Sequence, residues 1–496
     1  MKVLLGIDSG LTVTKAVLFD PSGAELASAA VRVPQRKPRP RWVERDMDEL
    51  WDATAKTVRD VLAAVPGAEV MSVGVTAHGD GIYLVGEDGR PVRPGILSLD
   101  SRAHQILREW EETGVAERAL QVTGQVPFVA TPAALLAWLA RHEPSSLART
   151  AKALSCKDYI KLRLTGVAST DPTEASVSFT DVRTQRYSDE AFDVFGLGDY
   201  AQLVAPVVTS TQVAGTVTAE AASRTGLPAG TPVVSGLHDV DACALGTGCV
   251  KPGQLSMVAG TYSINQVISD RPLPSRDWNC RNFVEPGRWM NMSLSPASAT
   301  NLEWFVDQLM LRDGDARDRR SCFEAVNAEV RDVLSERSGV LYLPFLFGSP
   351  LGPAASAAFL GIRGWHTRAH LLRAVFEGVV FNHRWHVDAL RSATTVSSAR
   401  LAGGAARSEV WAQMFADALN LEVGVGAANE TGALGAAICA GIGCGLYQDL
   451  DDAVAATVTI ARTYTPDSER SRRLEEDYAR YREAVAAASS TWRDDV

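Results

Sequence analysis

The segment Val3–Val17 constrains this chain more than any other, because it has the pattern of an apolar strand, a tight turn and a second strand. Asp8 ends the first strand, and Gly10 lies in the turn. A carboxylate, exposed backbone N–H groups and short donors suit the oxygens of a metal-bound phosphate chain. The donors are Thr12, Thr14 and Lys15. The other interpretation is a β-hairpin whose tip carries Asp and Gly without binding a ligand, since such turn residues are common.

Composition limits the classes of protein to which the chain can belong. The 496 residues suffice for two domains, and 46% hydrophobic with 22% charged residues is typical of a packed globular protein. The net charge of −10 argues against a general nucleic-acid or anionic-membrane binder, because such proteins need a basic surface. We therefore expect a small-molecule partner. No motif bears on oligomeric state, and a homodimer stays open.

Seven cysteines are scattered along the chain without a Cys-x-x-Cys pair, which predicts buried free thiols of a reducing compartment rather than a zinc site. The apolar run before Asp8 is too short for a signal peptide, and no run of 18 apolar residues occurs. We expect a cytoplasmic protein. The cysteines are Cys156, Cys243, Cys249, Cys280, Cys322, Cys439 and Cys444.

Strand and helix patterns alternate after the first hairpin. We expect a third strand over 24–33, an amphipathic helix over 47–64 and a buried strand over 70–75. A further strand over 82–85 turns at Glu87–Arg90 as a hairpin would. This order predicts an α/β fold, with a mixed sheet and helices packed on it.

The segment Gln254–Ile268 repeats the strand, glycine turn and strand of the opening. Gly260 and Thr261 fall opposite Ser9–Leu11, but no acid occupies the turn. Two such hairpins would let two similar lobes hold a phosphate chain between them. Two unrelated hairpins remain the alternative, because a resemblance over so short a stretch is weak evidence for duplication.

A short strand at Arg400–Ala402 runs into the glycine pair Gly403–Gly404, and a helix with an apolar face follows Ser408. Free N–H groups at the start of a helix favour an anion, so we expect this loop and Ser408 to contact a nucleotide. The small-residue helix at Glu430–Gly441 is interpreted as packing behind that loop.

Asp239 follows an apolar strand and a glycine, at the start of a helix of small residues. As an N-cap it would only accept hydrogen bonds from the helix backbone. As a general base it would take the proton of a substrate hydroxyl during phosphoryl transfer. Asp241 is the rival, but helical spacing directs it to a different side, and we favour Asp239.

Taken in order, several segments resemble the FGGY carbohydrate kinases, and the match covers nearly the whole chain. The Ser295–Phe305 segment and the His78–Gly81 loop make the chain most similar to kinases for L-xylulose and related ketopentoses, and next to erythritol kinases. The matching segments are the Asp8 hairpin, Trp42–Asp46 before a helix with Trp51, Asp100–Arg102, Gly236–Gly246, Gly260–Thr261 and Gly403–Gly404.

The resemblance implies two actin-like, ribonuclease-H-type lobes, with mixed sheets flanked by helices and with ATP and the sugar in the cleft. We place the lobes at residues 1–245 and 246–496. The resemblance also implies Mg²⁺ associated with Asp8 and Asp239, Asp239 as base, and sugar contacts from a second group of residues. That group is His78, Gly79, Asp80, Asp100, Arg102 and Asp239.

Three positions depart from the family pattern. Leu11 replaces the usual threonine, so Thr12 or Thr14 must supply the hydroxyl that faces phosphate. Ser98 replaces a tryptophan, and His78 replaces the glutamine of the sugar loop, which leaves the identity of the sugar open. His78 either hydrogen-bonds a sugar hydroxyl or is a structural residue.

Other classes explain less of the sequence. A nucleotide-binding chaperone or filament protein of the same superfamily needs neither the Asp239 acid nor a polar sugar loop. A sugar-responsive regulator would need a DNA-binding module, and we expect none at the amino end. A catalytically silent sugar-binding relative stays open.

Overall fold

The computed structural model describes residues 1–310, 319–349, 351–352 and 354–493. Its contacts divide the chain into two compact units. Unit 1 comprises Met1–Pro252, Ile268–Asn291 and Ala428–Thr459, and unit 2 comprises Gly253–Val267, Met292–Ala427 and Ile460–Val496. Among the described helices, none combines the length and the apolar character needed to cross a bilayer.

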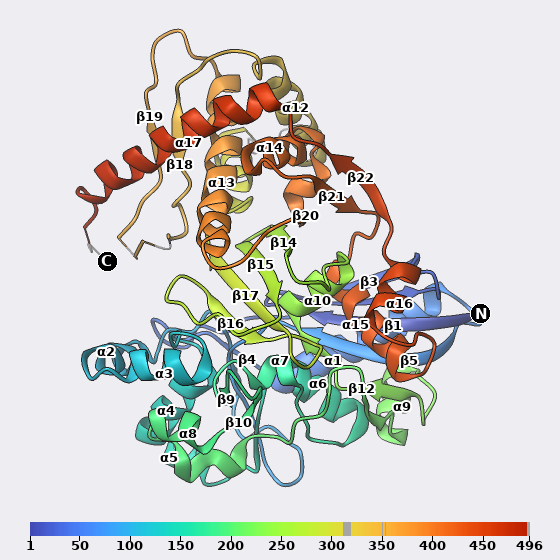
Figure 1. Cartoon of the computed structure of the whole chain (residues 1–496). Coiled ribbons are helices and arrows are strands. Elements are labelled where there is room, and N and C mark those ends of the chain that lie inside the picture. Colours follow the sequence, from blue (N-terminus) through green and yellow to red (C-terminus); the bar gives the residue numbers. More distant parts are fainter. Residues whose placement is uncertain (311–318, 350, 353, 494–496) are drawn as a thin grey trace. The chain divides into compact units, whose positions relative to one another are not determined.

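Unit 1 is built on a mixed sheet in the order β11-β12-β5-β1-β2-β3, with β13 paired to β5 (Figure 1). β1 runs antiparallel to β2 and parallel to β5, so the opening hairpin lies in the middle of the sheet. The strands are β1 (Lys2–Ser9), β2 (Val13–Phe19), β3 (Glu25–Arg32), β5 (Glu69–Ala77), β11 (Val213–Thr216), β12 (Pro232–Val234) and β13 (Leu237–His238).

The helices of unit 1 begin with α1, which matches the predicted range because Asp46 caps it by accepting from the N–H groups of Asp48 and Glu49. They are α1 (Met47–Ala64), α2 (His104–Glu112), α3 (Val115–Thr123), α4 (Pro132–His142), α5 (Pro144–Leu147), α6 (Cys156–Thr165), α7 (Pro172–Ala175), α8 (Asp189–Val194), η1 (Gly198–Leu203), α9 (Ala219–Thr225), α10 (Asp239–Gly246), α15 (Thr431–Gly443) and α16 (Leu450–Thr457).

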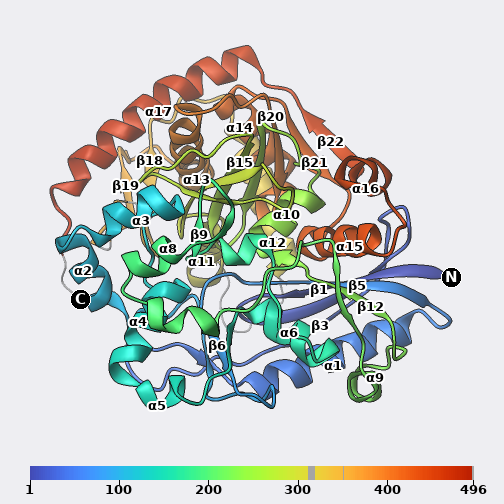
Figure 2. The same ribbon diagram turned by 60° about the horizontal axis from the view of Figure 1, so that its bottom comes forward.

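The two faces of β1 are covered by different helices, because successive side chains of a strand point to opposite sides. Val3, Leu5 and Ile7 pack in the core that also contains α1. Leu4, on the other face, packs in the core that contains α15. Both views show α15 running alongside β1 and β5 (Figures 1 and 2).

A glycine pair brings α15 into close contact with this sheet. Gly6 of β1 and Gly74 of β5 are register partners. A Cβ on Gly6 would lie 2.0 Å from Ala433 O, and a Cβ on Gly74 would lie 1.9 Å from Ala436 O. The small residues of α15 thus fit it against β1, β5 and α10 of unit 1, and its packing behind the Gly403–Gly404 loop stays a prediction.

Unit 2 contains most of a second mixed sheet, whose full order is β16-β17-β15-β14-β20-β21-β22. β14 pairs antiparallel with β15 and parallel with β20, which confirms the predicted second hairpin. The strands of this sheet are β14 (Gln254–Ala259), β15 (Ser263–Ser269), β16 (Asn279–Asn282), β17 (Trp289–Ser295), β20 (Ser398–Ala402), β21 (Val423–Gly426) and β22 (Ile460–Tyr464).

The helices of unit 2 include the predicted helix after Ser408. They are α11 (Thr300–Phe305), the π-helical turn η2 (Val306–Met310), α12 (Arg319–Asp332), α13 (Arg368–Arg391), η3 (Gly404–Arg407), α14 (Glu409–Leu419) and α17 (Ser468–Ser489). Small two-stranded sheets complete the two units: β4 (Glu44–Arg45) with β7 (Gly95–Ile96), β6 (Tyr83–Val85) with β8 (Lys152–Leu154), β9 (Thr180–Asp181) with β10 (Arg186–Tyr187), and β18 (Leu341–Leu343) with β19 (Ala358–Leu360).

The seven cysteines are free thiols, and five of them are buried. Cys243 and Cys444 are partly exposed. The prediction of free rather than paired cysteines is confirmed.

Candidate active site

Asp8 lies at the end of β1, in the middle strand of the unit 1 sheet. Burial raises its pKa to about 7, the neighbouring charges of Asp239 and Glu430 add to the rise, and Lys15 opposes it. Lys15, predicted to contact phosphate, donates to Glu430 at 2.7 Å. A Cβ on Gly432, at the start of α15, would lie 2.6 Å from Asp8 Oδ2, so this helix begins directly beside the carboxylate.

The turn after β1 is closed by a hydrogen bond from Gly10 N to Val13 O at 2.9 Å. The two threonines that follow have different surroundings. Thr14 is buried, and its hydroxyl lies 2.9 Å from Ser9 Oγ. Thr12 is exposed in the turn.

Asp239 is the first residue of α10 rather than its cap, and His238 occupies the N-cap position. The Asp239 side chain is 35% exposed, and its Oδ1 lies 3.1 Å from His238 Nδ1. Burial alone would raise the pKa of Asp239, but the hydrogen bond with His238 and the charge of that ring hold it below its usual value. Asp239 is thus an ionised carboxylate that solvent can reach.

Asp241, the rival base, is buried within the same helix and is 2% exposed. Burial raises its pKa to about 7, while His238 and Arg281 oppose the rise. In the part of the chain that the structure describes, its Oδ1 has no hydrogen-bond partner. A shielded, partly protonated carboxyl is a poorer base than Asp239.

His78, Gly79 and Asp80 follow β5 and lie against the same helix start. His78 is buried, its Nε2 lies 3.1 Å from the Tyr83 hydroxyl, and burial lowers its pKa to about 4. Gly79 packs on the ring of His238, because a Cβ on Gly79 would lie 1.6 Å from His238 Nε2. Asp80 has a positive φ of 56°, and its side chain is 19% exposed. The structure therefore brings this loop and Asp239 together through His238.

Two residues that the sequence did not suggest complete this cluster. Arg281 of β16 donates from Nε to Gln125 Oε1 at 2.8 Å, and its Nη1 lies 3.4 Å from His238 Nε2. Its Nη2 lies 3.4 Å from Asp80 Oδ1. Neither Arg281 nor Gln125 stands in a recognisable pattern, since the fold brings them together from positions 156 residues apart.

Glu174 of α7 is a third residue that sequence reasoning missed. It is 7% exposed, and burial raises its pKa to about 8, opposed by the charges of His238 and Lys157. The charge of Glu174, with that of Asp239, in turn raises the pKa of His238 to about 9 against the effect of burial. The two carboxyl groups therefore favour the protonated form of His238.

Asp100 and Arg102, which were predicted to contact the sugar, form a buried ion pair with each other and are not exposed at the surface. Their side chains are fully buried and 2.8 Å apart. Arg102 also donates to Glu44 at 2.8 Å and stacks on Trp42, with the guanidinium carbon 3.9 Å from the ring centroid. Asp100 accepts from Val43 N as well. These contacts brace the segment around β4 and β7, and direct contact with the sugar stays a prediction.

In unit 2 the two predicted nucleotide loops lie against each other. A Cβ on Gly403 would lie 2.6 Å from Ala259 O and 3.1 Å from Gly260 N. Thr261 follows in the same turn, and its carbonyl accepts from the Thr300 hydroxyl at 3.2 Å. Gly404 begins the 3-10 turn η3, and α14 starts after Ser408 as predicted.

Ser408 has a capping role in this structure. Its hydroxyl accepts from Trp411 N at 3.1 Å and hydrogen-bonds Asn327, which occupies the side chain that was predicted to contact the nucleotide. This hydroxyl satisfies one of the free N–H groups that begin α14.

The carboxylates of unit 1 fit a magnesium ion of the kind that a nucleotide carries. Among the described residues, no three His, Cys, Asp or Glu side chains converge as a metal cage. Asp8 and Asp239 act on each other as like charges, which a divalent cation would relieve. Two carboxylates with water and phosphate oxygens are the ligand set that Mg²⁺ favours.

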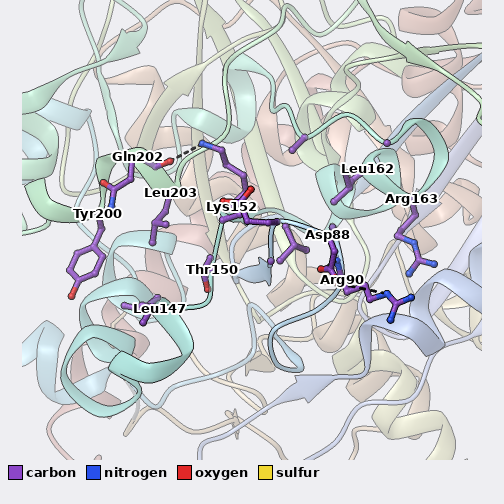
Figure 3. Close-up of a pocket in the computed structure, with 18 of the residues that line it drawn as sticks. Asp88, Arg90, Leu147, Thr150, Lys152, Leu162, Arg163, Tyr200, Gln202 and Leu203 are labelled. Carbon is purple, nitrogen blue, oxygen red and sulfur yellow. Dashed lines mark hydrogen bonds and ion pairs between the residues drawn. The ribbon is translucent and has the colours of Figure 1, made fainter.

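A broad depression of about 1310 Å³ on unit 1 contains none of these residues (Figure 3). Three cations that line it already have partners within the protein. Lys152 donates to Gln202 O at 2.7 Å, Arg163 donates to Asp48 at 3.0 Å, and Arg90 lies near Asp88. We therefore assign the active site to the Asp8 and Asp239 cluster and not to this depression.

Comparison with known proteins identifies the family of this chain. Residues 3–246 and 255–444 match the N-terminal and C-terminal domains of the FGGY family of carbohydrate kinases. The chain is 34% identical to an L-xylulose/3-keto-L-gulonate kinase of Escherichia coli, over 97% of this chain and 96% of the relative. It is 31% identical to an erythritol kinase of Brucella abortus, over 99% and 97% of the two chains.

A solved structure shows the same fold. The xylulose kinase of Rhodospirillum rubrum superposes with a TM-score of 0.87 at 27% identity, over 99% of both chains. The expected α/β architecture of two actin-like, ribonuclease-H-type lobes is confirmed by this likeness and by the two mixed sheets with flanking helices. The chain belongs to the FGGY family of carbohydrate kinases and is an ATP-dependent sugar phosphotransferase.

Proposed function

We propose that this enzyme phosphorylates the terminal hydroxyl of a 2-ketopentose such as L-xylulose, with ATP and Mg²⁺. The observation that carries the proposal is Asp239, an ionised and accessible carboxylate beside the polar loop at His78–Asp80. The names of the relatives support a ketopentose, and the erythritol kinase among them makes a polyol the second candidate. In this proposal residues 1–245 form the lobe with the sugar site, the Mg²⁺ and phosphate hairpin and the catalytic Asp239, and residues 246–496 form the ATP-binding lobe.

Asp239 would accept the proton of the substrate hydroxyl as its oxygen attacks the γ-phosphorus and the bond to ADP breaks. His238 keeps the carboxylate ionised and oriented through the 3.1 Å contact. Asp8 and Asp239 would hold Mg²⁺ together with phosphate oxygens. The ion, when bound, neutralises charge on the transferring group.

The γ- and β-phosphate oxygens would be bound by backbone and hydroxyl donors from the glycine turns. We assign these contacts to Gly10, Thr12, Gly260, Thr261 and Gly403, with Gly404 lining the nucleotide. Lys15 would exchange its partner Glu430 for phosphate. Thr14 and Ser408 would act through packing, because their hydroxyls are engaged within the protein.

The test is replacement of Asp239 by Asn, with Asp241→Asn as the matched control. D239N should lower sugar-dependent ADP release by about 10²–10⁴-fold and leave ATP binding measurable by calorimetry. D241N should retain most activity, because it replaces a buried carboxyl whose pKa is already about 7. Near-normal turnover of D239N, or loss only in D241N, would reject the assignment of the base.

The identity of the substrate is tested by ADP release over a panel of L-xylulose, D-xylulose, D-ribulose, L-ribulose, erythritol, glycerol and sugar acids. We expect the highest kcat/KM with a ketopentose. A preference for erythritol would favour the second candidate.

A further inference from the structure

Arg281 and Asp80 face each other in the candidate active site, and their chemistry bears on what the site recognises. We propose that this pair recognises an α-hydroxyketone, the carbonyl with an adjacent hydroxymethyl group that ends a 2-ketose. The inference rests on the proposed function, because it concerns the substrate of the same site.

The guanidinium of Arg281 is held at one edge only. The side chain is 5% exposed, and Nε donates to Gln125 Oε1 at 2.8 Å. The other two nitrogens make long contacts, each of 3.4 Å, with His238 Nε2 and Asp80 Oδ1. Contacts of this length are weak hydrogen bonds, so these N–H groups can form shorter bonds with a ligand oxygen.

Asp80 is presented to Arg281 by an unusual backbone conformation. Its φ of 56° lies in the left-handed region, and the following Gly81 also has a positive φ of 79°. A non-glycine residue in this region costs energy and persists where the surrounding structure holds it. The conformation leaves the carboxylate partly exposed beside the guanidinium.

Successive contacts connect the proposed base, Asp239, to Arg281 and Asp80. Asp239 lies 3.1 Å from His238, His238 lies 3.4 Å from Arg281, and Arg281 lies 3.4 Å from Asp80. A linear sugar bound against these connected groups would place one terminal hydroxyl at Asp239 and its other end at Arg281 and Asp80. In a 2-ketose phosphorylated at its far terminus, that other end is the α-hydroxyketone.

The donor and acceptor pattern of the pair matches this group. A guanidinium can only donate, and an ionised carboxylate can only accept. A ketone oxygen can only accept, and the adjacent hydroxyl can donate. A polyol carries hydroxyls at both positions and can reverse their roles, so its binding depends less on Arg281. A sugar acid would place a carboxylate beside Asp80, where like charges repel.

The experiment compares ketoses with polyols in Arg281→Met, Arg281→Lys and the control Arg288→Met. Arg288 lies in the same segment but is 34% exposed and paired with Glu285 at 3.7 Å. The kcat/KM of each variant is measured for L-xylulose, D-xylulose, xylitol and erythritol, and the midpoint of urea unfolding is measured in parallel. R281K keeps the positive charge but lacks the planar guanidinium with its several N–H donors. This variant tests the proposal if R281M does not fold.

We expect R281M to lower kcat/KM for the ketose by about 100-fold and for the polyols by less than about 10-fold. R281K should lower kcat/KM by a smaller factor, again more for the ketose than for the polyols. The KM for ATP should match the wild type in these variants. R288M should have the wild-type kcat/KM for both substrate classes. Equal loss for both substrate classes, no loss, or a raised KM for ATP would overturn the inference.

The failure of the proposed function would look different. If the wild type phosphorylates polyols and no ketose, the inference is overturned while the kinase assignment stands. If it phosphorylates no sugar, the proposed function fails, and thermal shift with ketose alone decides the inference. A shift by the ketose in the wild type that R281M abolishes would support it, and its absence from the wild type would overturn it.

Discussion

At the residue scale, Thr12 and Thr14 lie two positions apart, but their side chains have different surroundings. The Thr14 hydroxyl is buried against Ser9, whereas Thr12 stands at the exposed tip. Leu11 occupies the position where the family carries a threonine, so either residue could have taken over its role. The geometry favours Thr12, because only its hydroxyl is exposed to an incoming nucleotide.

Substituting each threonine by valine separates the two roles. T12V should raise KM for ATP or lower kcat by roughly tenfold, through the loss of one phosphate donor, with unchanged stability. T14V should leave KM for ATP near the wild-type value and reduce the free energy of unfolding by about 1–2 kcal/mol, because Ser9 loses its buried partner. Steady-state kinetics and urea unfolding check both, and the reverse assignment would contradict the structure.

At the element scale, the contact of α15 with β1 and β5 is set by the absence of side chains at Gly6 and Gly74. Backbone carbonyls of the helix occupy the positions where their Cβ atoms would stand. Because α15 begins at Thr431 beside Asp8, this packing also fixes the surroundings of the Asp8 carboxylate.

Gly74→Ala should therefore reduce the free energy of unfolding by about 3 kcal/mol or more, since the new methyl group would lie 1.9 Å from Ala436 O. Activity should fall as well, because a displaced α15 moves Gly432 away from Asp8. Gly364→Ala is the matched control, since a Cβ there has no described atom within 4 Å. Equal unfolding midpoints for the two variants would show that α15 is not packed as described.

The elements that could be predicted from the sequence are those specified by residues within the element itself, such as capping and turn residues. The helix over 47–64 has a capping Asp46, and both glycine hairpins carry their own turn residues. Pairings between segments far apart in the chain are not marked by any such residues in the sequence. The strand at 82–85 turns back as the predicted hairpin would, through antiparallel bridges of Val85 with Pro91 and of Ile82 with Ile96, but its second pairing, with β8 about 70 residues away, was not predicted. Arg281 and Glu174 enter the site for the same reason, through tertiary contacts that periodicity does not encode.

At the scale of the whole molecule, buried histidines couple the stability of unit 2 to pH. In unit 2, His386 of α13 is 2% exposed and hydrogen-bonds Ser293 and Ser295 at 2.8 and 2.9 Å. Burial lowers its pKa to about 4, and burial also lowers that of neighbouring His383. In the unfolded chain the pKa of a histidine is about 6.5.

Unit 2 should lose stability as the pH falls from 7 to 5, because the unfolded chain binds a proton that folded His386 excludes. The loss is roughly 2 kcal/mol for this group, and stability should return as the pH rises above 6.5. Calorimetry with separate transitions for the two units checks this. His386→Asn should flatten the pH dependence, whereas His142→Gln, at an exposed histidine, should not. An unchanged slope in H386N would assign the acid sensitivity to other groups.

The contact between Gly79 and the ring of His238 has a consequence for redesign of this enzyme. A mutant library that varies position 79 alone would contain few folded variants, because any side chain there must displace the imidazole of His238, which contacts Asp239. Varying positions 79 and 238 together opens that space, and smaller residues at 238 would admit side chains at 79 in the proposed sugar site. The two positions are best treated as a single site of mutagenesis, although 159 positions of sequence separate them.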